Sequence, residues 1–210
     1  MYISQSKCDS LSDKEIIELS LKDVEYFRCL YNRYAPRLKL YVSKISDFSK
    51  EQIKDIIQDA FVNVWKNINA YDDSMKFSSF LYRIVHNETV SHWRKQRTIN
   101  KTLDVLGKES SANTLNYNRE ENGTIYEEKK EKIEKVLSLL PPKYREILVL
   151  KFLENMDYEE ISNILMIPEG TVATRINRAK KAFAKIAKKE FSTAFGFDNK
   201  NRYLLTDNNG

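Results

Sequence analysis

Residues 158–183 carry the pattern of two short helices separated by a turn. Ile161, Ile164 and Leu165 fall on one helical face together with Tyr158, and Asp157 stands where it can cap the first turn. Residues 166–170 interrupt this pattern and are expected to form a tight turn. Four apolar residues then share one face of a second helix that is predicted to start at Thr171: Val172, Ile176, Ala179 and Phe183. The pattern predicts a helix-turn-helix.

The outer face of this second helix is polar and basic. It is predicted to present Thr171, Thr174, Arg175, Arg178, Lys181 and, nearer the edge, Lys180. Short polar groups can meet base edges, and guanidinium groups can pair with guanine or phosphate. The alternative is a solvated basic face on an ordinary helix. The complete helix, turn and helix arrangement favours DNA binding.

The rest of the chain is also predicted to be helical. Only 5 Gly and 4 Pro occur among 210 residues, whereas helix-forming residues are abundant. Periodicity lapses over a polar, acidic stretch at 99–128, which divides the chain. We therefore expect an all-α protein with two small helical domains, at 13–98 and 129–190, joined by a flexible linker at 99–128 and followed by a polar tail at 191–210.

Several residues indicate where helices begin. Ser12 with Glu15 three positions later is typical of an N-cap, so order is expected to begin there. Pro36 is expected either to kink a helix or to separate two, and Pro142 suits a first helical turn. A broad apolar stripe at 53–65 predicts a helix that packs inward along its whole length.

Other classes of site find little support. Cys8 and Cys29 lack CxxC spacing and a nearby pair of histidines, so neither a disulfide framework nor a zinc site is predicted. No cofactor is indicated. His86 and His92 lie six positions apart and would face different sides of a helix, so no catalytic set can be built from them, and they are interpreted as exposed or DNA-proximal. Without a signal segment or membrane span, we expect a soluble protein in the reducing cytoplasm.

Four blocks of sequence resemble one known family. They are residues 55–65, 80–87, 139–146 and 168–179, within a match over 25–188. In this order they resemble the extracytoplasmic-function (ECF) group of bacterial RNA polymerase sigma factors, in the sigma-70 family. The resemblance implies a non-enzymatic promoter-specificity subunit. Its implied partners are core RNA polymerase, through the largest-subunit clamp and the flap, promoter DNA, and an anti-sigma factor that in this family can be membrane-bound. Direct membrane insertion is not implied.

The resemblance also assigns roles to residues. Asp55, Gln58 and Asp59 would dock on the largest polymerase subunit, and their spacing places them on one side of a helix. Pairing with Lys54 or Arg33 is the alternative, whereas a metal site would lack a third ligand.

The minus-ten promoter element would be melted and held by the N-terminal domain, and the helix-turn-helix would read the minus-35 element. The residues placed near the minus-ten strand are Tyr71, Lys76, Ser79, Arg83, Asn87, Arg94 and Arg97. An aromatic ring and basic groups are the means by which a protein stabilises unstacked single-stranded DNA. Tyr82 and Trp93 are interpreted as core. Phe80, Ser91 and Asn177 depart from the commoner Trp, Asp and His of the family.

Two other classes of protein fit the sequence less well. A stand-alone helix-turn-helix regulator would need a ligand or phosphoacceptor domain, and 13–98 shows no glycine-rich loop or alternating strands. An RNA-binding or anti-termination protein would bind without polymerase. The sigma subunit is therefore the preferred hypothesis.

Overall fold

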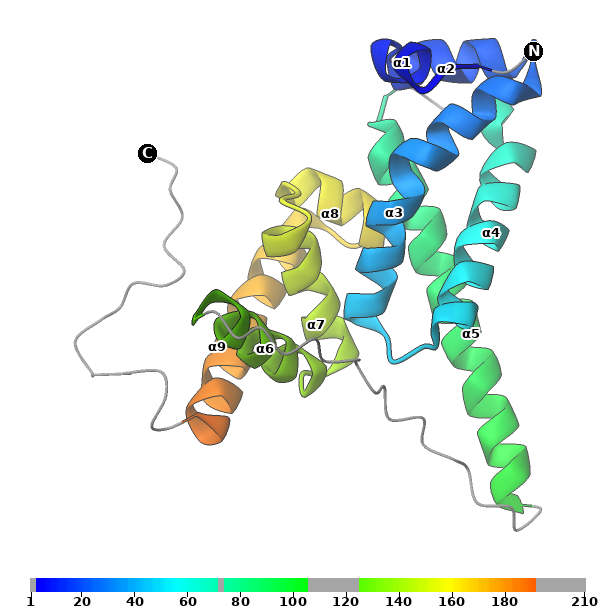
Figure 1. Ribbon diagram of the computed structural model, residues 1–210. Coiled ribbons are helices and arrows are strands. Elements are labelled where there is room, and N and C mark those ends of the chain that lie inside the picture. Colours follow the sequence, from blue (N-terminus) through cyan, green and yellow to red (C-terminus); the bar gives the residue numbers. More distant parts are fainter. Residues whose placement is uncertain (1–2, 72–73, 106–124, 192–210) are drawn as a thin grey trace, which may run out of the picture.

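The computed structural model describes residues 3–71, 74–105 and 125–191, and across these ranges the regular elements are helices (Figure 1). The N-terminal part holds α1 (Gln5–Ser10), α2 (Asp13–Ser20), α3 (Phe27–Ile45), α4 (Lys50–Lys66) and α5 (Phe77–Val105). The C-terminal part holds α6 (Ile125–Ser138), α7 (Pro142–Leu148), α8 (Tyr158–Leu165) and α9 (Glu169–Glu190). Three short elements lie between them: η1 (Val24–Tyr26), η2 (Ile68–Ala70) and η3 (Val149–Leu153), the last a π-helical turn. The all-α prediction is confirmed.

Capping residues set several helix starts as the sequence predicts. The Ser12 side chain accepts from the Glu15 backbone, and the Glu15 carboxylate accepts from the Ser12 backbone N–H at 2.8 Å. Asp157 and Glu160 form the same capping box at α8. Pro142 is the first residue of α7, where its missing N–H leaves no hydrogen bond unmade. Pro36 lies inside α3, so it does not separate two helices.

The N-terminal core lies between α3, α4 and α5, which run side by side (Figure 1). The apolar stripe of α4 packs inward as predicted, with Ile56 and Ile57 completely buried. Leu38 of α3 and Leu81 of α5 are equally inaccessible. Trp65 departs from the prediction because it lies at the helix end, where it packs edge-on against Phe27 and stays 37% exposed.

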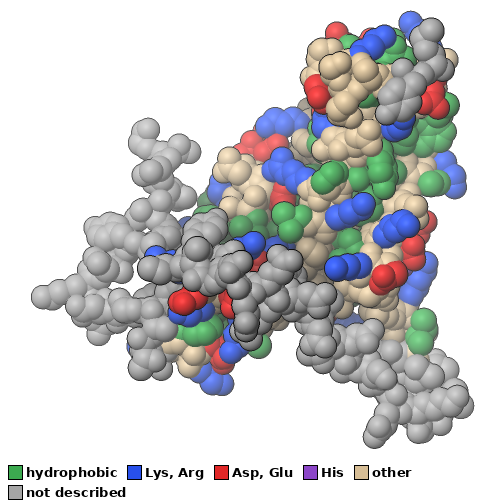
Figure 2. Space-filling model, viewed as in Figure 1, with side chains coloured by type: hydrophobic (Ala, Val, Ile, Leu, Met, Phe, Trp, Pro, Cys, Tyr) green, Lys and Arg blue, Asp and Glu red, His purple; other side chains and the backbone are tan. Residues whose placement is uncertain are grey.

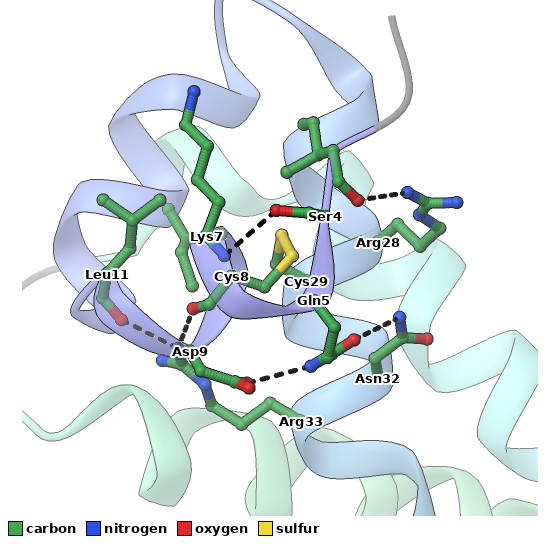
Figure 3. Close-up of a disulfide and its surroundings, with 12 residues drawn as sticks. Ser4, Gln5, Lys7, Cys8, Asp9, Leu11, Arg28, Cys29, Asn32 and Arg33 are labelled. Carbon is green, nitrogen blue, oxygen red and sulfur yellow. Dashed lines mark hydrogen bonds between the residues drawn. A yellow bond between two sulfur atoms is a disulfide. The ribbon is translucent and has the colours of Figure 1, made fainter.

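Order begins before Ser12, and the two cysteines are bonded to each other. Cys8 of α1 forms a disulfide with Cys29 of α3, with their Cα atoms 5.2 Å apart (Figure 3). The prediction of no disulfide is wrong. The fold brings together two cysteines that are 21 positions apart, and no local sequence motif indicates their pairing. Arg33 reinforces the junction by donating to the Cys8 and Leu11 carbonyl oxygens, both at 2.7 Å.

The connector is shorter than predicted at both ends. Helix α5 continues through 99–105, and α6 already begins at Ile125. Extending an existing helix costs little per residue, so a polar sequence can remain helical beyond the last buried position. Residues 106–124, which hold most of the predicted linker, lie outside the described residues, as do 192–210 of the predicted tail.

The two domains pack directly against each other. Helix α8 lies against α5, and α6, α7 and η3 lie against α3. Figure 1 shows α7 beside α3 near the centre of the molecule. Residues from both domains therefore contribute to one buried region. This packing decides which predicted site residues are accessible.

Candidate interfaces for DNA and polymerase

The outer face of α9 is built as predicted. Val172, Ile176 and Ala179 are buried beneath it, whereas Thr171, Thr174, Arg178 and Lys181 are exposed and Arg175 is half-buried. Beside this face is a hollow of about 360 Å³, lined by Lys143, Tyr144, Gly170, Thr171, Thr174, Arg175 and Arg178. Lys180 is directed elsewhere, since its Nζ lies 5.2 Å from the centre of the Phe152 ring.

In the turn between α8 and α9, the residue with the left-handed backbone conformation is not the glycine. Met166 adopts the left-handed conformation with φ 53° and ψ 47°, and Gly170 already lies in the first turn of α9. The second helix therefore starts at Glu169 and not at Thr171. Ser162 Oγ donates to the Ile167 carbonyl oxygen at 2.6 Å, which ties the turn back to α8.

The three residues predicted to meet polymerase lie together on α4. Asp55, Gln58 and Asp59 are all exposed on the side opposite the buried stripe. Arg33 does not pair with them, because its guanidinium binds Asp13 at 2.5 Å. No ion pair within 3–71, 74–105 and 125–191 holds Asp55 or Asp59, so both carboxylates are presented to solvent.

The residues predicted to meet the minus-ten strand divide into two groups. Asn87, Arg94 and Arg97, along the middle and distal part of α5, are exposed. The others lie near the second domain or inside a cluster: Tyr71 packs on the Phe77 and Phe80 rings, Lys76 binds Glu160 at 3.0 Å, and Arg83 donates to Met166 Sδ at 3.7 Å. Ser79 is only 1% exposed, and its hydroxyl has no hydrogen-bond partner. In this arrangement Ser79 cannot touch DNA.

Surface charge on one side of the molecule is mixed. Figure 2 shows Lys and Arg side chains over both domains, interleaved with Asp and Glu. The acidic first turn of α8, with Glu159 and Glu160 after the cap Asp157, lies next to Lys76. Its carboxylates raise the pKa of Lys76, chiefly through the hydrogen bond that Lys76 donates to Glu160.

Two buried carboxylates of the C-terminal domain are bound by side chains of the N-terminal domain. Glu154 accepts from Arg37 Nε at 2.6 Å and from the Tyr82 hydroxyl at 2.5 Å. Glu146 Oε1 accepts from the Tyr41 hydroxyl at 2.7 Å and lies 2.6 Å from His86 Nδ1. Burial, with the adjacent carboxylate, raises the pKa of both tyrosines far above the usual range. Both therefore remain neutral hydrogen-bond donors.

No sequence pattern pointed to Glu146 or Glu154 as functional residues, and the predicted exposure of the two histidines is wrong. His86 is not an exposed or DNA-proximal residue, because the docked domain covers it and supplies Glu146 as its partner. His92 is half-buried against Phe48. Tyr82 is core as predicted, and Trp93 packs on Phe48. An acidic residue on a helix carries no local signal that a second domain will bury it.

Comparison with known proteins identifies the family. The sigma-70 region 2 family matches residues 30–99, and the sigma-70 region 4 family matches residues 130–183. The chain is 35% identical over 139 residues to the ECF RNA polymerase sigma factor SigW of Bacillus subtilis, covering 64% of this chain and 74% of SigW. The chain belongs to the ECF sigma factors. It is thus a promoter-recognising subunit of RNA polymerase, and not an enzyme.

Other relatives agree with this assignment along most of the chain. The ECF sigma-E factor of Escherichia coli K12 is 27% identical over 180 residues, which cover 83% of this chain and 93% of that factor. The fold resembles the sigma factor RpoE solved in complex with the anti-sigma factor NepR from Bartonella quintana, with a TM-score of 0.64, 20% identity, and 77% and 96% of the two chains covered. It also resembles CnrH solved with the cytosolic domain of CnrY, at TM-score 0.62 and 18% identity, over 85% and 98%.

Within 3–71, 74–105 and 125–191, no three His, Cys, Asp or Glu side chains gather as a metal site. None of the helices in these ranges has the length and apolar character needed to span a bilayer.

Proposed function

We propose that this sigma factor divides promoter recognition among three surfaces. Asp55, Gln58 and Asp59 on α4 bind the clamp of core polymerase. Residues of α5 and the segment before it hold the melted minus-ten strand, and the outer face of α9 reads the minus-35 element. The domains at 13–98 and 129–190 carry these roles, and the protein works in the cytoplasm, where polymerase meets promoter DNA.

The single observation that supports this division most strongly is the basic face of α9 beside a hollow. Arg175 and Arg178 line that hollow together with Thr171 and Thr174. From Thr171 to Lys189 the helix carries no acidic residue, so nothing on this stretch repels phosphate. A helix with its N-terminal residues toward base edges and its cations along the backbone is the arrangement of a recognition helix in the major groove.

Alanine at Arg175 or Arg178 is expected to weaken binding to duplex minus-35 DNA. Loss of an arginine that contacts a base costs about 1–3 kcal/mol of binding free energy. Loss of one that contacts a phosphate lowers the slope of log affinity against log salt concentration by about one. Fluorescence anisotropy over a range of salt concentrations measures both. Lys185→Ala is the matched control, because Lys185 is exposed on the same helix outside the hollow. Unchanged affinity and salt slope in both arginine variants would remove α9 from the proposal.

In vitro transcription tests the function as a whole. The full chain would be added to core polymerase with a library of randomised promoters, and transcripts would be sequenced. Enrichment of two motifs at a fixed spacing upstream of the start site is the expected result. A stand-alone helix-turn-helix regulator, the alternative, would bind duplex DNA yet give no start-site-specific transcripts with core polymerase.

An anti-sigma partner is also part of the proposal. One similar structure is of the sigma factor RpoE in complex with the anti-sigma factor NepR, and another is of CnrH in complex with the cytosolic domain of CnrY. A regulator that wedges between the two domains of this chain would have to displace the contacts of α8 on α5 and of α7 on α3. Affinity purification of the full chain from its host, followed by mass spectrometry, would identify it.

A further inference from the structure

The Cys8–Cys29 disulfide fastens a short helix that has few other attachments. Helix α1 is six residues long, and Cys8 is the one buried residue among them. A helix of this length is unstable on its own in water, so α1 depends on its contact with α3. Just before it, Ile3 is 7% exposed, and its carbonyl oxygen accepts from Arg28 Nη2 at 3.0 Å. The position of α1 on α3 therefore depends chiefly on the disulfide.

The surroundings of the two cysteines suit thiol–disulfide exchange. Cationic side chains lie around the bond (Figure 3), namely those of Lys7, Arg28 and Arg33. Arg33 donates to the Cys8 carbonyl oxygen at 2.7 Å. Asp9, the one acid of α1, accepts from Gln5 Nε2 at 2.9 Å. Once the bond is reduced, neighbouring cations favour the thiolate form of a cysteine, and the thiolate is the nucleophile of the exchange reaction.

Arg33 joins the disulfide-bonded helix to α2. Its guanidinium donates to the Cys8 and Leu11 carbonyl oxygens, both at 2.7 Å, and it binds Asp13, the first residue of α2, at 2.5 Å. The other carboxylate oxygen of Asp13 accepts from the Tyr34 hydroxyl. When α1 leaves α3, Arg33 loses the Cys8 acceptor. Water then reaches the ion pair with Asp13 and weakens it by screening.

Tyr34 connects this junction to the segment proposed to hold the minus-ten strand. Its ring packs edge-on against Phe77, with 5.8 Å between the ring centres. Phe77 packs on Tyr71 and Phe80, with ring centres 5.4 Å and 6.1 Å away. Tyr71 is the ring proposed to meet the melted bases, and its hydroxyl donates to the Met75 carbonyl oxygen at 2.8 Å. Because closely packed side chains transmit strain, loosening Tyr34 changes how firmly Tyr71 is held.

A disulfide is unusual in the compartment where this protein is proposed to work. Thiol reductants keep most cytoplasmic cysteines reduced, and the disulfides found there are usually transient, catalytic or redox-sensing. The chain has just two cysteines, so a cysteine-based redox response must come from this pair. We propose that Cys8 and Cys29 form a redox switch, which fastens α1 when small-molecule disulfides accumulate and so strengthens capture of the melted minus-ten strand. This inference rests on the proposed function, to which it adds a signal.

Closing the switch takes two exchange steps. In the dithiol state α1 is loose, and Cys8 is the more accessible cysteine because it lies on that helix. The Cys8 thiolate attacks one sulfur of the oxidant RSSR, which forms a mixed disulfide and releases one thiolate RS⁻. The Cys29 thiolate then attacks the Cys8 sulfur, which forms the protein disulfide and releases the second RS⁻. The two cysteines give two electrons to the oxidant, and their protons pass to the two released thiols.

Mass spectrometry and hydrogen exchange test the switch itself. The reduced full chain, folded and treated with glutathione disulfide as the probe, is expected to lose two hydrogen atoms by way of a glutathione adduct on Cys8. Amide exchange in α1 should then become at least about tenfold slower, because the helix can no longer separate from α3. Exchange in α9 should not change. Failure of the bond to form, or equally fast exchange of α1 in both states, would overturn the proposal.

Open-complex formation tests the effect on the minus-ten strand. A promoter obtained from the library selection carries a fluorescent base analogue in its nontemplate minus-ten strand, and core polymerase is supplied with the oxidised or the dithiol form of the full chain. The oxidised form should give at least about fivefold more open complex. Cys8→Ser with Cys29→Ser should match the dithiol form and should not respond to glutathione disulfide. Binding to duplex minus-35 DNA should be equal in all three proteins, because α9 lies in the other domain.

A further variant tests the connection through α3. Tyr34→Phe keeps the ring that packs on Phe77 but loses the hydrogen bond to Asp13. Its oxidised and dithiol forms should therefore give nearly equal amounts of open complex, although its disulfide still forms. Circular dichroism confirms that each variant is folded. A full redox difference in Tyr34→Phe would overturn the connection proposed here.

The outcomes separate this inference from the proposed function. If both forms of wild type give promoter-specific transcripts in equal amounts, the redox switch is wrong and the sigma function stands. If neither form gives promoter-specific transcripts with core polymerase, the proposed function fails, and the proposed effect of the disulfide on the minus-ten strand fails with it.

Discussion

Replacing Asp55 and Asp59 by lysine is expected to abolish binding of this sigma factor to core RNA polymerase. Both carboxylates are exposed on one side of α4 and unpaired within the described residues, so they are available to basic groups of a partner. Removing one member of a desolvated interfacial charge pair costs about 2–5 kcal/mol, and reversal adds repulsion. The dissociation constant should therefore rise about a thousandfold or more. Surface plasmon resonance with immobilised core enzyme measures it.

The control for this experiment keeps the change in net charge constant. Glu18→Lys with Glu25→Lys reverses two exposed acids near the N-terminus and should bind core polymerase like wild type. The Asp55 and Asp59 variant should keep its affinity for duplex minus-35 DNA, because α9 is unaltered. Wild-type affinity of the reversed protein for core polymerase would refute the assignment of α4.

Loss of the Cys8–Cys29 disulfide is expected to lower the free energy of unfolding by about 3 kcal/mol. The bond joins residues with a sequence separation of 21. A crosslink over a loop of this length lowers the conformational entropy of the unfolded chain, which stabilises the folded state by about 3 kcal/mol. Urea unfolding of the double variant Cys8→Ser with Cys29→Ser, compared with the oxidised wild type, gives the difference. In a protein whose total stability is of the order of 5–15 kcal/mol this is a large share.

Chemical reduction supplies the control for the disulfide. The two cysteines are 2% and 1% exposed, so wild type should be reduced while unfolded and then refolded with reductant present. It should then match the serine variant, and reductant should leave that variant unchanged. Equal stability of oxidised and reduced wild type would mean that the crosslink does not constrain the unfolded chain.

Local patterns determined most of the helices and the faces of two helices that we propose as interfaces. The N-caps at Ser12 and Asp157 lie within single turns, where side chain and backbone are neighbours in sequence, and both formed as predicted. Helical periodicity likewise predicted the buried stripe of α4 and the exposed Asp55, Gln58 and Asp59 opposite it. A helix fixes which side chains share a face, so these relations need no knowledge of the rest of the chain.

Only the tertiary structure decided which side chains meet across long separations. Cys8 and Cys29 are brought together by the packing of α1 on α3, although their spacing matches no motif. The partners of Glu146 and Glu154, and the burial of His86, depend on one domain docking on another. Amino-acid sequence by itself determined local geometry, because turns and caps involve near neighbours. The pairing of distant groups depends on the relative placement of whole helices, which no short segment of sequence encodes.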